Sequence, residues 1–198
     1  MVFHFIYDHL FCNSRYDWAE RVGLKFDCIS HQPAHVMGPL MCKSHHEIWQ
    51  LRAAGLLEGK ETSPMLYNIV DTRDIAKCAR LSAESAVSKN GSRYLMVSTR
   101  GTGEMHVPEM QAMIQTLYPH VDVAGASEGK SGGALADTVA AREELGMDFH
   151  CIEDTLRATI DSTIELGYIL PKGEIKHTLF RWHDRLQPLL LGAQQPKL

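Results

Sequence analysis

The chain has 198 residues, of which 44% are hydrophobic and 22% are charged, and 24 acidic against 20 basic side chains leave a formal net charge of −4. This composition is typical of a globular protein with a buried core, and it excludes a disordered or fibrous chain. The length predicts one domain, or one domain with an appendage. A pI near 6.2 lacks the basic excess of a nucleic-acid-binding protein, so we expect no nucleic-acid partner.

The cysteines and the apolar runs predict the compartment. The five cysteines are odd in number and at least 14 residues apart, which excludes a CxxC motif and favours a reducing, intracellular compartment, either cytoplasmic or organellar. No stretch approaches the roughly 20 apolar residues of a spanning helix. The first residues have no basic start, and Asp8 interrupts their apolar run. We therefore expect a protein that is neither secreted nor membrane-spanning.

The first third of the chain predicts a helix, a strand, a loop and a second helix. A helix is expected from about His9 to Val22, and the two-residue alternation of Leu24–Ser30 favours a strand. The prolines and the glycine of His31–Pro39 predict an irregular loop. A second helix is expected at Lys43–Ala54, closed by Gly55.

The middle of the chain predicts two strands and two helices. A short strand at Met65–Val70 leads into Asp71, which has Asp74 three residues later. This spacing is a capping-box variant and predicts a helix at Thr72–Ser88. A strand is expected at Arg93–Ser98, and Pro108 opens a helix that ends at Tyr118.

The last third predicts a loop, two helices and a separate tail. The loop 125–133 contains Gly-Lys-Ser, but Ala124 stands where a phosphate-binding loop needs its first glycine, so we interpret it as a connector. Asp137 caps a short helix that ends at Gly146. The next helix, Glu153–Leu166, carries an apolar stripe of residues spaced by four, namely Ile152, Leu156, Ile160 and Ile164.

The tail 172–198 combines an apolar face with basic residues. Its net charge is +3, and its apolar face is formed by Ile175, Leu179, Trp182, Leu186 and Leu189. This pattern predicts an amphipathic helix, interrupted near Pro188. Its apolar face is expected to pack on its own domain, on a protein partner or on an anionic membrane surface.

Five segments in collinear order carry a family resemblance. They are LKFDCIS, QPAHVMGP, YNIVDTRDIAKCA, SRYLMVS and AREELGMDFHCIEDTLRATIDSTIELGYI. Their order resembles the C-terminal half of extended short-chain dehydrogenases/reductases, most of all the dihydroflavonol reductase and cinnamoyl-CoA reductase group. The resemblance implies an α/β fold, the C-terminal portion of a Rossmann-like sheet, with a partial domain at 1–170 and an added amphipathic extension at 171–198.

The resemblance also implies site residues. In the family, the Pro-x-x-Val-x-Gly-Pro segment contacts the nicotinamide carboxamide of NADP or NAD, which assigns Pro33 and Val36 to the cofactor. Asp71 and Arg73 match a Val-Asp-x-Arg-Asp segment that places an arginine near the substrate. The alternative interpretation is that Asp71 is only a helix cap and that Arg73 is only a surface ion-pair partner.

Two departures from the family pattern bear on catalysis. The position of the catalytic tyrosine falls on Tyr7, but the lysine expected four residues later is Phe11. That lysine would lower the pKa of the phenol and hold the ribose. The sequence also contains no Gly-x-Gly-x-x-Gly turn for a pyrophosphate. We therefore expect an NAD(P)-dependent reductase-like chain, truncated or degenerate, that does not act alone on a carbonyl.

Two further expectations concern metals and partners. Four histidines lie within 16 residues, at His31, His35, His45 and His46. Their spacing gives no convergent geometry, so no metal site is expected. The competing function is a non-catalytic accessory subunit of a larger assembly, with a protein partner covering an open sheet edge or the C-terminal helix.

Overall fold

The computed structural model describes residues 17–18, 20–23, 27–45, 48–58, 66–98, 105–123 and 136–168. The predictions for Tyr7, Phe11, the loop 125–133 and the tail 171–198 lie outside these residues. The described elements are, in chain order, β1 (Ser30–Pro33), β2 (His35–Met37), η1 (Lys43–His45), α2 (Ile48–Gly55), η2 (Leu56–Glu58), β3 (Leu66–Tyr67), β4 (Ile69–Asp71), α3 (Thr72–Glu84), β5 (Arg93–Met96), β6 (Met105–His106), α4 (Val107–Leu117), α5 (Val139–Leu145) and α6 (Ile152–Glu165).

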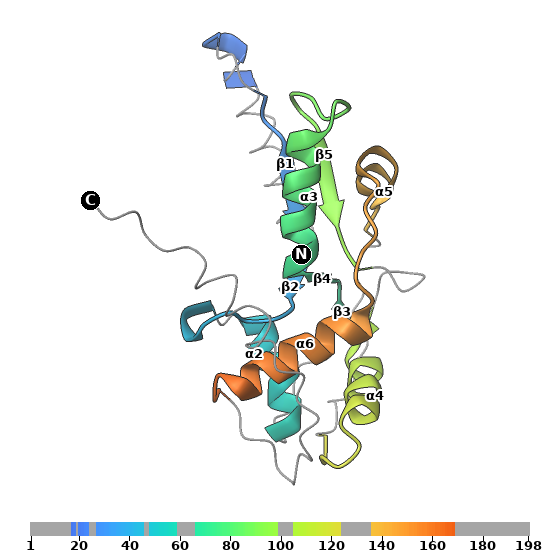
Figure 1. The fold of residues 1–198 in the computed structure, drawn as a ribbon. Coiled ribbons are helices and arrows are strands. Elements are labelled where there is room, and N and C mark those ends of the chain that lie inside the picture. Colours follow the sequence, from blue (N-terminus) through green and yellow to red (C-terminus); the bar gives the residue numbers. More distant parts are fainter. Residues whose placement is uncertain are drawn as a thin grey trace, which may run out of the picture.

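The described strands form three pairs. β1 pairs in parallel with β5, β2 pairs in parallel with β4, and β3 pairs antiparallel with β6. Helix α3 runs along the first pair, whereas α2, α4 and α6 gather beyond its lower end (Figure 1). The expected mixed α/β fold with parallel strands is confirmed. Within the described residues, no helix is long and apolar enough to cross a membrane.

The described core residues form two hydrophobic clusters. The first joins α2, β4, α4 and α6, and its members include Met37, Leu57 and Leu156. The predicted apolar stripe of α6 packs into it, since three of its residues are buried and Ile164 lies against them. The second cluster joins β4 and β5 to α3 and α5 around Tyr94.

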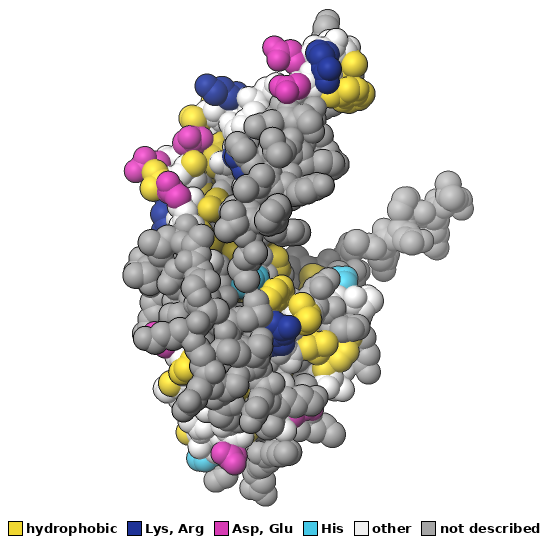
Figure 2. Space-filling view, turned by 180° about the vertical axis from the view of Figure 1, so that it is seen from behind, with side chains coloured by type: hydrophobic (Ala, Val, Ile, Leu, Met, Phe, Trp, Pro, Cys, Tyr) yellow, Lys and Arg dark blue, Asp and Glu magenta, His cyan; other side chains and the backbone are white. Residues whose placement is uncertain are grey.

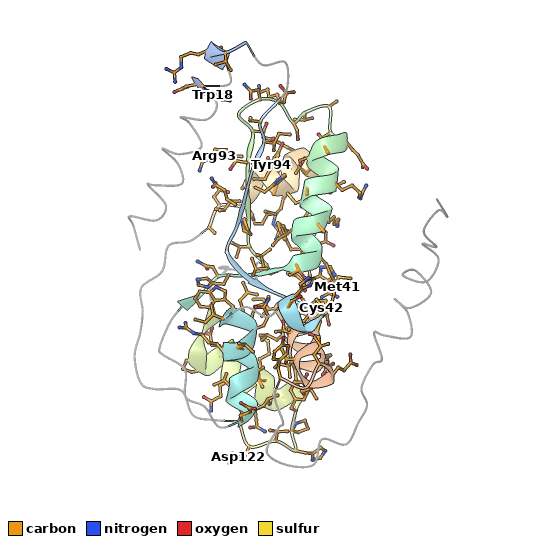
Figure 3. The ribbon with its side chains drawn as sticks, turned by 90° about the vertical axis from the view of Figure 1, so that its left-hand side faces the viewer. Trp18, Met41, Cys42, Arg93, Tyr94 and Asp122 are labelled. Atoms are coloured by element: carbon orange, nitrogen blue, oxygen red, sulfur yellow. The ribbon has the colours of Figure 1, made fainter. Side chains whose placement is uncertain are left out.

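The faces of β5 follow the two-residue alternation of a strand. Tyr94 turns toward α3, and its neighbour Arg93 points to the other face (Figure 3). The Tyr94 hydroxyl lies 2.7 Å from that of Ser88 and donates a hydrogen bond of 3.1 Å to Glu144. Arg93 donates to the Gln32 side chain at 2.9 Å. One face of the β1–β5 pair is therefore an aromatic and apolar core, and the opposite face carries polar side chains.

The prediction of an irregular loop at His31–Pro39 is wrong, because β1 and β2 occupy most of it. A strand tolerates proline where its nitrogen has no ladder bond to make. The Ser30 N–H donates to Ser92, just before β5, and the Ala34 N–H donates to Met96 in β5. Because successive residues of a strand point their backbone groups to opposite sides, the nitrogen of Pro33 points away from β5. The strand is also shifted from its predicted position, since it begins at Ser30, the last residue of the predicted range.

Most predicted helices form with shorter bounds. The predicted helix Lys43–Ala54 is a 3₁₀ turn at Lys43–His45 followed by α2 from Ile48. Helix α3 ends at Glu84 rather than Ser88. The glycines Gly146 and Gly167 follow α5 and α6 in left-handed conformations, as expected of helix C-terminal residues.

The surface carries a few exposed hydrophobic side chains. On the face drawn in Figure 2, acidic, basic and hydrophobic side chains are interspersed at the upper end, and hydrophobic ones gather lower down beside a basic and a histidine side chain. Among the residues that the structure describes, the large hydrophobic side chains that are at least half exposed are Trp18, Val22, Met41, Ile48, Val87 and Val139.

Candidate functional site

The segment Pro33–Pro39, expected to face a nicotinamide, contains a local break in strand geometry. Ala34 donates its N–H to Met96, and the next residue, His35, donates its N–H to Asn68 at 2.7 Å. The Ser98 N–H donates to Ile69 at 2.6 Å, so β4 lies on the same side of this chain as the end of β5. Successive N–H groups that point to one side are the mark of a β-bulge.

The bulge gives β1 and β2 a common outer edge. Because backbone groups alternate along a strand, those of His31, Pro33 and Val36 point away from β5 and β4. Among the described residues, no strand pairs with this outer edge. The two residues assigned to the cofactor, Pro33 and Val36, therefore present their backbone groups on the same edge.

Gly38 brings this segment into contact with the start of α3. Its φ is +114°, which side chains rarely adopt, and a Cβ there would lie 2.7 Å from Thr72 Oγ1 and 2.8 Å from Asp71 Oδ1. Only glycine leaves room at this position for the side chains of Asp71 and Thr72 and for the backbone nitrogen of Thr72. The close approach joins the Pro33–Pro39 segment to the predicted Asp71 cap.

Asp71 caps α3 and also binds the arginine two residues later. Its Oδ1 accepts the Arg73 N–H at 2.8 Å, and its two oxygens accept the guanidinium at 2.8 and 2.6 Å. Burial by itself raises the pKa of this carboxyl, but the hydrogen bonds and charge of Arg73 outweigh it and hold the pKa below its usual value. The structure thus shows Arg73 as the ion-pair partner of its own helix cap.

Asp74 does not complete the predicted capping box. A capping box needs the third helical residue to reach back to the cap. Instead, the fully buried Asp74 accepts the backbone N–H of His150 at 2.9 Å and lies 2.7 Å from its ring Nδ1. This part of the prediction is wrong, because His150, which is 76 residues away in sequence, occupies both carboxylate oxygens. The contact ties the start of α3 to the segment that enters α6.

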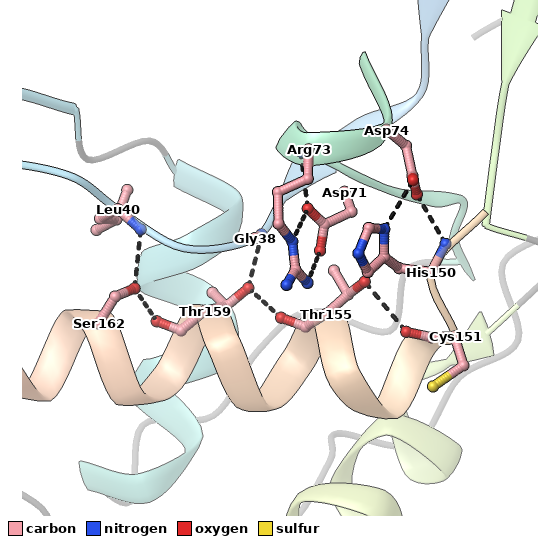
Figure 4. Close-up of polar contacts among 10 residues, drawn as sticks. All are labelled: Gly38, Leu40, Asp71, Arg73, Asp74, His150, Cys151, Thr155, Thr159 and Ser162. Carbon is pink, nitrogen blue, oxygen red and sulfur yellow. Dashed lines mark hydrogen bonds and ion pairs between the residues drawn. The ribbon is translucent and has the colours of Figure 1, made fainter. Parts of the chain in front are cut away.

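Helix α6 contributes a row of hydroxyl groups to the same site. The Gly38 N–H donates to Thr159 Oγ1 at 2.8 Å, and the Leu40 N–H donates to Ser162 Oγ at 2.9 Å (Figure 4). Each hydroxyl donates its own proton to a carbonyl of α6, that of Thr155 or Thr159. The backbone just after β2 is therefore held by side chains of α6 across more than 120 residues of sequence.

A stacked group lies at the start of β2, against α2. The His35 ring stacks on Trp49 of α2 with ring centroids 3.9 Å apart, and the Arg52 guanidinium carbon lies 5.0 Å from the centre of the Trp49 ring. Burial and the charge of Arg52 lower the pKa of His35, which keeps its imidazole neutral at neutral pH. Among the described residues, no group of three or more potential ligands could hold a metal ion.

The structure brings together most of the predicted site and adds residues to it. Pro33 and Val36 share an edge, and Arg73 lies at the helix start that Gly38 touches. The residues that sequence reasoning missed are His150, Thr159 and Ser162. Hydroxyl side chains at positions 155, 159 and 162 recur with helical spacing, and such a row inside a helix is a signal for polar contacts, because Ser and Thr otherwise disfavour helix interiors.

Comparison with known proteins gives matches of structure only. No protein-family model and no curated protein sequence matches the chain. Yeast methylglyoxal/isovaleraldehyde reductase Gre2 in complex with NADPH is 18% identical, with a TM-score of 0.62 over 78% of this chain and 48% of Gre2. A nucleoside-diphosphate-sugar epimerase from Pseudomonas aeruginosa is also 18% identical, with a TM-score of 0.60 over 81% of this chain and 55% of the epimerase.

A third similar structure is the Bordetella bronchiseptica enzyme WbmF in complex with NADH. It is 15% identical, with a TM-score of 0.58 over 78% of this chain and 50% of WbmF. The chain thus spans about half the length of the solved structures that it matches. The predicted resemblance to extended short-chain dehydrogenases/reductases is confirmed at the level of fold: the chain has a partial fold of that kind.

Proposed function

We propose that these 198 residues form the C-terminal, substrate-lobe portion of an NAD(P)-dependent reductase-like protein. In this proposal, residues 1–170 are the partial domain and 171–198 are an extension. The chain supplies the nicotinamide-facing segment with Pro33 and Val36, but no pyrophosphate site. It therefore neither binds a dinucleotide tightly nor reduces a carbonyl without a nucleotide-binding half, although Tyr7 is its candidate proton donor.

The outer edge of β1 and β2 is the observation that carries the proposal. Parallel strands occur almost only in sheets that are covered on both faces. In the described part of the chain, by contrast, each parallel sheet has only two strands. An edge that offers the backbone groups of His31, Pro33 and Val36 suits continuation of the sheet and contact with a carboxamide, which needs one donor and one acceptor. The half-length match to NADPH- and NADH-bound structures supports the same interpretation.

Arg73 has a different part in this proposal from the one the resemblance implies. Its guanidinium binds Asp71 with two hydrogen bonds, so an anionic substrate would have to compete with a buried carboxylate. We therefore assign Arg73 the role of fixing the helix cap beside Gly38. A direct role in substrate binding would require the guanidinium to leave Asp71.

Titration of the full chain with NADPH and NADH tests the absence of a dinucleotide site. Calorimetry should show no saturable binding at micromolar concentrations, because the sequence lacks the glycine-rich turn that binds a pyrophosphate. A complete reductase of the same fold serves as the positive control. Saturable micromolar binding by these 198 residues would refute the proposal.

Titration with nicotinamide tests the edge itself. At millimolar concentrations, nicotinamide should shift the amide resonance of Val36 in a ¹⁵N-labelled sample, because the Val36 backbone points outward and a carboxamide can pair with it. Pyridine is the matched control, since it keeps the ring and lacks the carboxamide. Equal responses to both compounds, or a response elsewhere only, would contradict the role of Val36.

The alternative proposal is a non-catalytic accessory subunit, and it is favoured by the same outer edge. A strand edge of this kind is a template for pairing with another chain. The protein partner would then cover this edge or the basic segment 171–198. Deleting residues 172–198 discriminates between the two surfaces: a monodisperse and equally stable protein would remove the segment as a docking site.

A further inference from the structure

We propose that Thr159 and Ser162 are positioning residues that set the backbone orientation of the nicotinamide-facing segment. The inference deepens the proposed function and rests on it for the identity of the ligand. Two hydroxyls of α6 act together with the β2–β4 ladder to determine where the backbone of Val36 points.

The direction of each hydrogen bond supports this role. The Thr159 hydroxyl donates to the Thr155 carbonyl at 2.7 Å, and the Ser162 hydroxyl donates to the Thr159 carbonyl at 2.9 Å. With its proton committed inside the helix, each oxygen presents lone pairs to the segment after β2. Gly38 and Leu40 fill these acceptor positions with their N–H groups. A hydroxyl is the group that can donate to its own helix and accept from a neighbouring backbone at once.

Burial makes these contacts costly to lose. Thr159 is fully buried, and Ser162 is 4% exposed. Without the hydroxyl oxygens, the buried N–H groups of Gly38 and Leu40 would lose the acceptors that they have in the structure, and a buried donor left unpaired costs more than the net value of a hydrogen bond. The segment would then move to find acceptors, and Val36 lies only two residues from Gly38.

Besides the two hydroxyls, the β2–β4 ladder holds this segment, with Val36 opposite Val70 and Met37 opposite Asp71, and one further contact lies on each side of Val36. His35 donates its N–H to Asn68 in the loop before β4. Gly38 fits against Asp71 and Thr72 without room for a Cβ. The bond from His35 fixes the chain before Val36, and the bonds to Thr159 and Ser162 fix it afterwards. Removing the bonds to Thr159 and Ser162 should therefore release the end of β2 and shift the Val36 peptide within the β2–β4 ladder, while leaving β1 in place.

Three variants of the full chain test the inference. Thr159→Val keeps the shape and removes the hydroxyl, and Thr159→Ser restores the hydroxyl. Thr163→Val is the matched control, because Thr163 is buried on the same helix and donates to the Ile160 carbonyl at 2.7 Å, whereas the Gly38 and Leu40 bonds go to Thr159 and Ser162. Ser162→Ala gives a second test of the clamp should Thr159→Val fold poorly.

Amide hydrogen exchange and the N–H residual dipolar coupling of Val36 are the measurements. In Thr159→Val, exchange at Gly38 should be roughly five- to tenfold faster, the factor expected for one lost hydrogen bond. The Val36 coupling should change relative to amides of α3. Both quantities should return to wild-type values in Thr159→Ser and be unaffected in Thr163→Val.

The outcomes separate the inference from the proposed function. Unchanged exchange at Gly38, an unchanged Val36 coupling, or equal acceleration throughout the protein in Thr159→Val would overturn the positioning role, since a purely structural residue gives the last pattern. The nicotinamide titration of the wild type bears on the proposed function alone. A wild type without a Val36 response would refute the function while the exchange and coupling data still decide the role of Thr159.

Discussion

Substituting Gly38 by alanine tests the close approach on which the site is built. Two costs add in this variant. Holding a non-glycine residue at a φ of +114° costs about 1 to 3 kcal/mol. The new Cβ would also lie 2.7 Å from Thr72 Oγ1 and 2.8 Å from Asp71 Oδ1, and overpacking of this kind costs about 1 to 3 kcal/mol more.

Gly91→Ala is the matched control for Gly38→Ala. Gly91 has a φ of +88°, and nothing lies within 4 Å of the point that a Cβ would occupy there, so it incurs only the backbone cost of about 1 to 3 kcal/mol. Gly38→Ala should therefore lower the free energy of unfolding by about 2 to 6 kcal/mol, and by more than Gly91→Ala. Urea denaturation followed by circular dichroism measures both values. Equal losses would refute the argument that the Asp71 and Thr72 contacts demand glycine.

Three further predictions concern the charges and the core. Arg73→Ala leaves the buried Asp71 carboxylate without its cation and should cost about 2 to 4 kcal/mol at pH 7. Because Arg73 holds the pKa of Asp71 below its ordinary value of 3.8, the gap to wild type in urea midpoint should close as the pH falls below about 4; a gap that persists at low pH would contradict the ion-pair explanation. Burial raises the pKa of Asp161, although the Tyr118 hydroxyl at 2.6 Å and the charge of Arg157 partly offset it. Asp161→Asn should therefore gain stability relative to wild type as the pH rises above about 4, and a pH-independent difference between their thermal midpoints would exclude this assignment. Leu156→Ala, at a fully buried position of α6, should cost about 2 to 5 kcal/mol in urea denaturation, and a loss below about 1 kcal/mol would mean that α6 does not pack as described.

Local signals in the sequence predicted the elements where the determining contacts are themselves local. The Asp71 side chain caps α3 by accepting a hydrogen bond from a residue two positions later, so the cap could be identified from adjacent residues. The four-residue spacing of apolar side chains in α6 likewise predicted its buried face. The family resemblance added the parallel α/β arrangement, which periodicity alone does not distinguish from other mixed folds.

The errors arose where distant residues decided the outcome. Asp74 follows the spacing of a capping box, yet His150 binds both of its oxygens. Pro33 can end a strand because its nitrogen faces the outer edge, with which none of the described strands pairs. Which edge this is depends on where β5 pairs, and β5 lies some 60 residues later in the chain. A pattern of neighbouring residues does not indicate which distant residue will become the hydrogen-bond partner.

The sequence by itself determined the α/β class, most of the helices, the Asp71 cap and the absence of a glycine-rich pyrophosphate turn from these 198 residues, because each depends on residue types at short spacing. Only the tertiary structure decided that Arg73 binds its own helix cap, that Pro33 and Val36 share an outer edge, and that Thr159 and Ser162 hold the backbone beside it. These features depend on hydrogen bonds between segments far apart in the chain or on the direction in which backbone groups point. Both are set only when the strands and helices pack against one another.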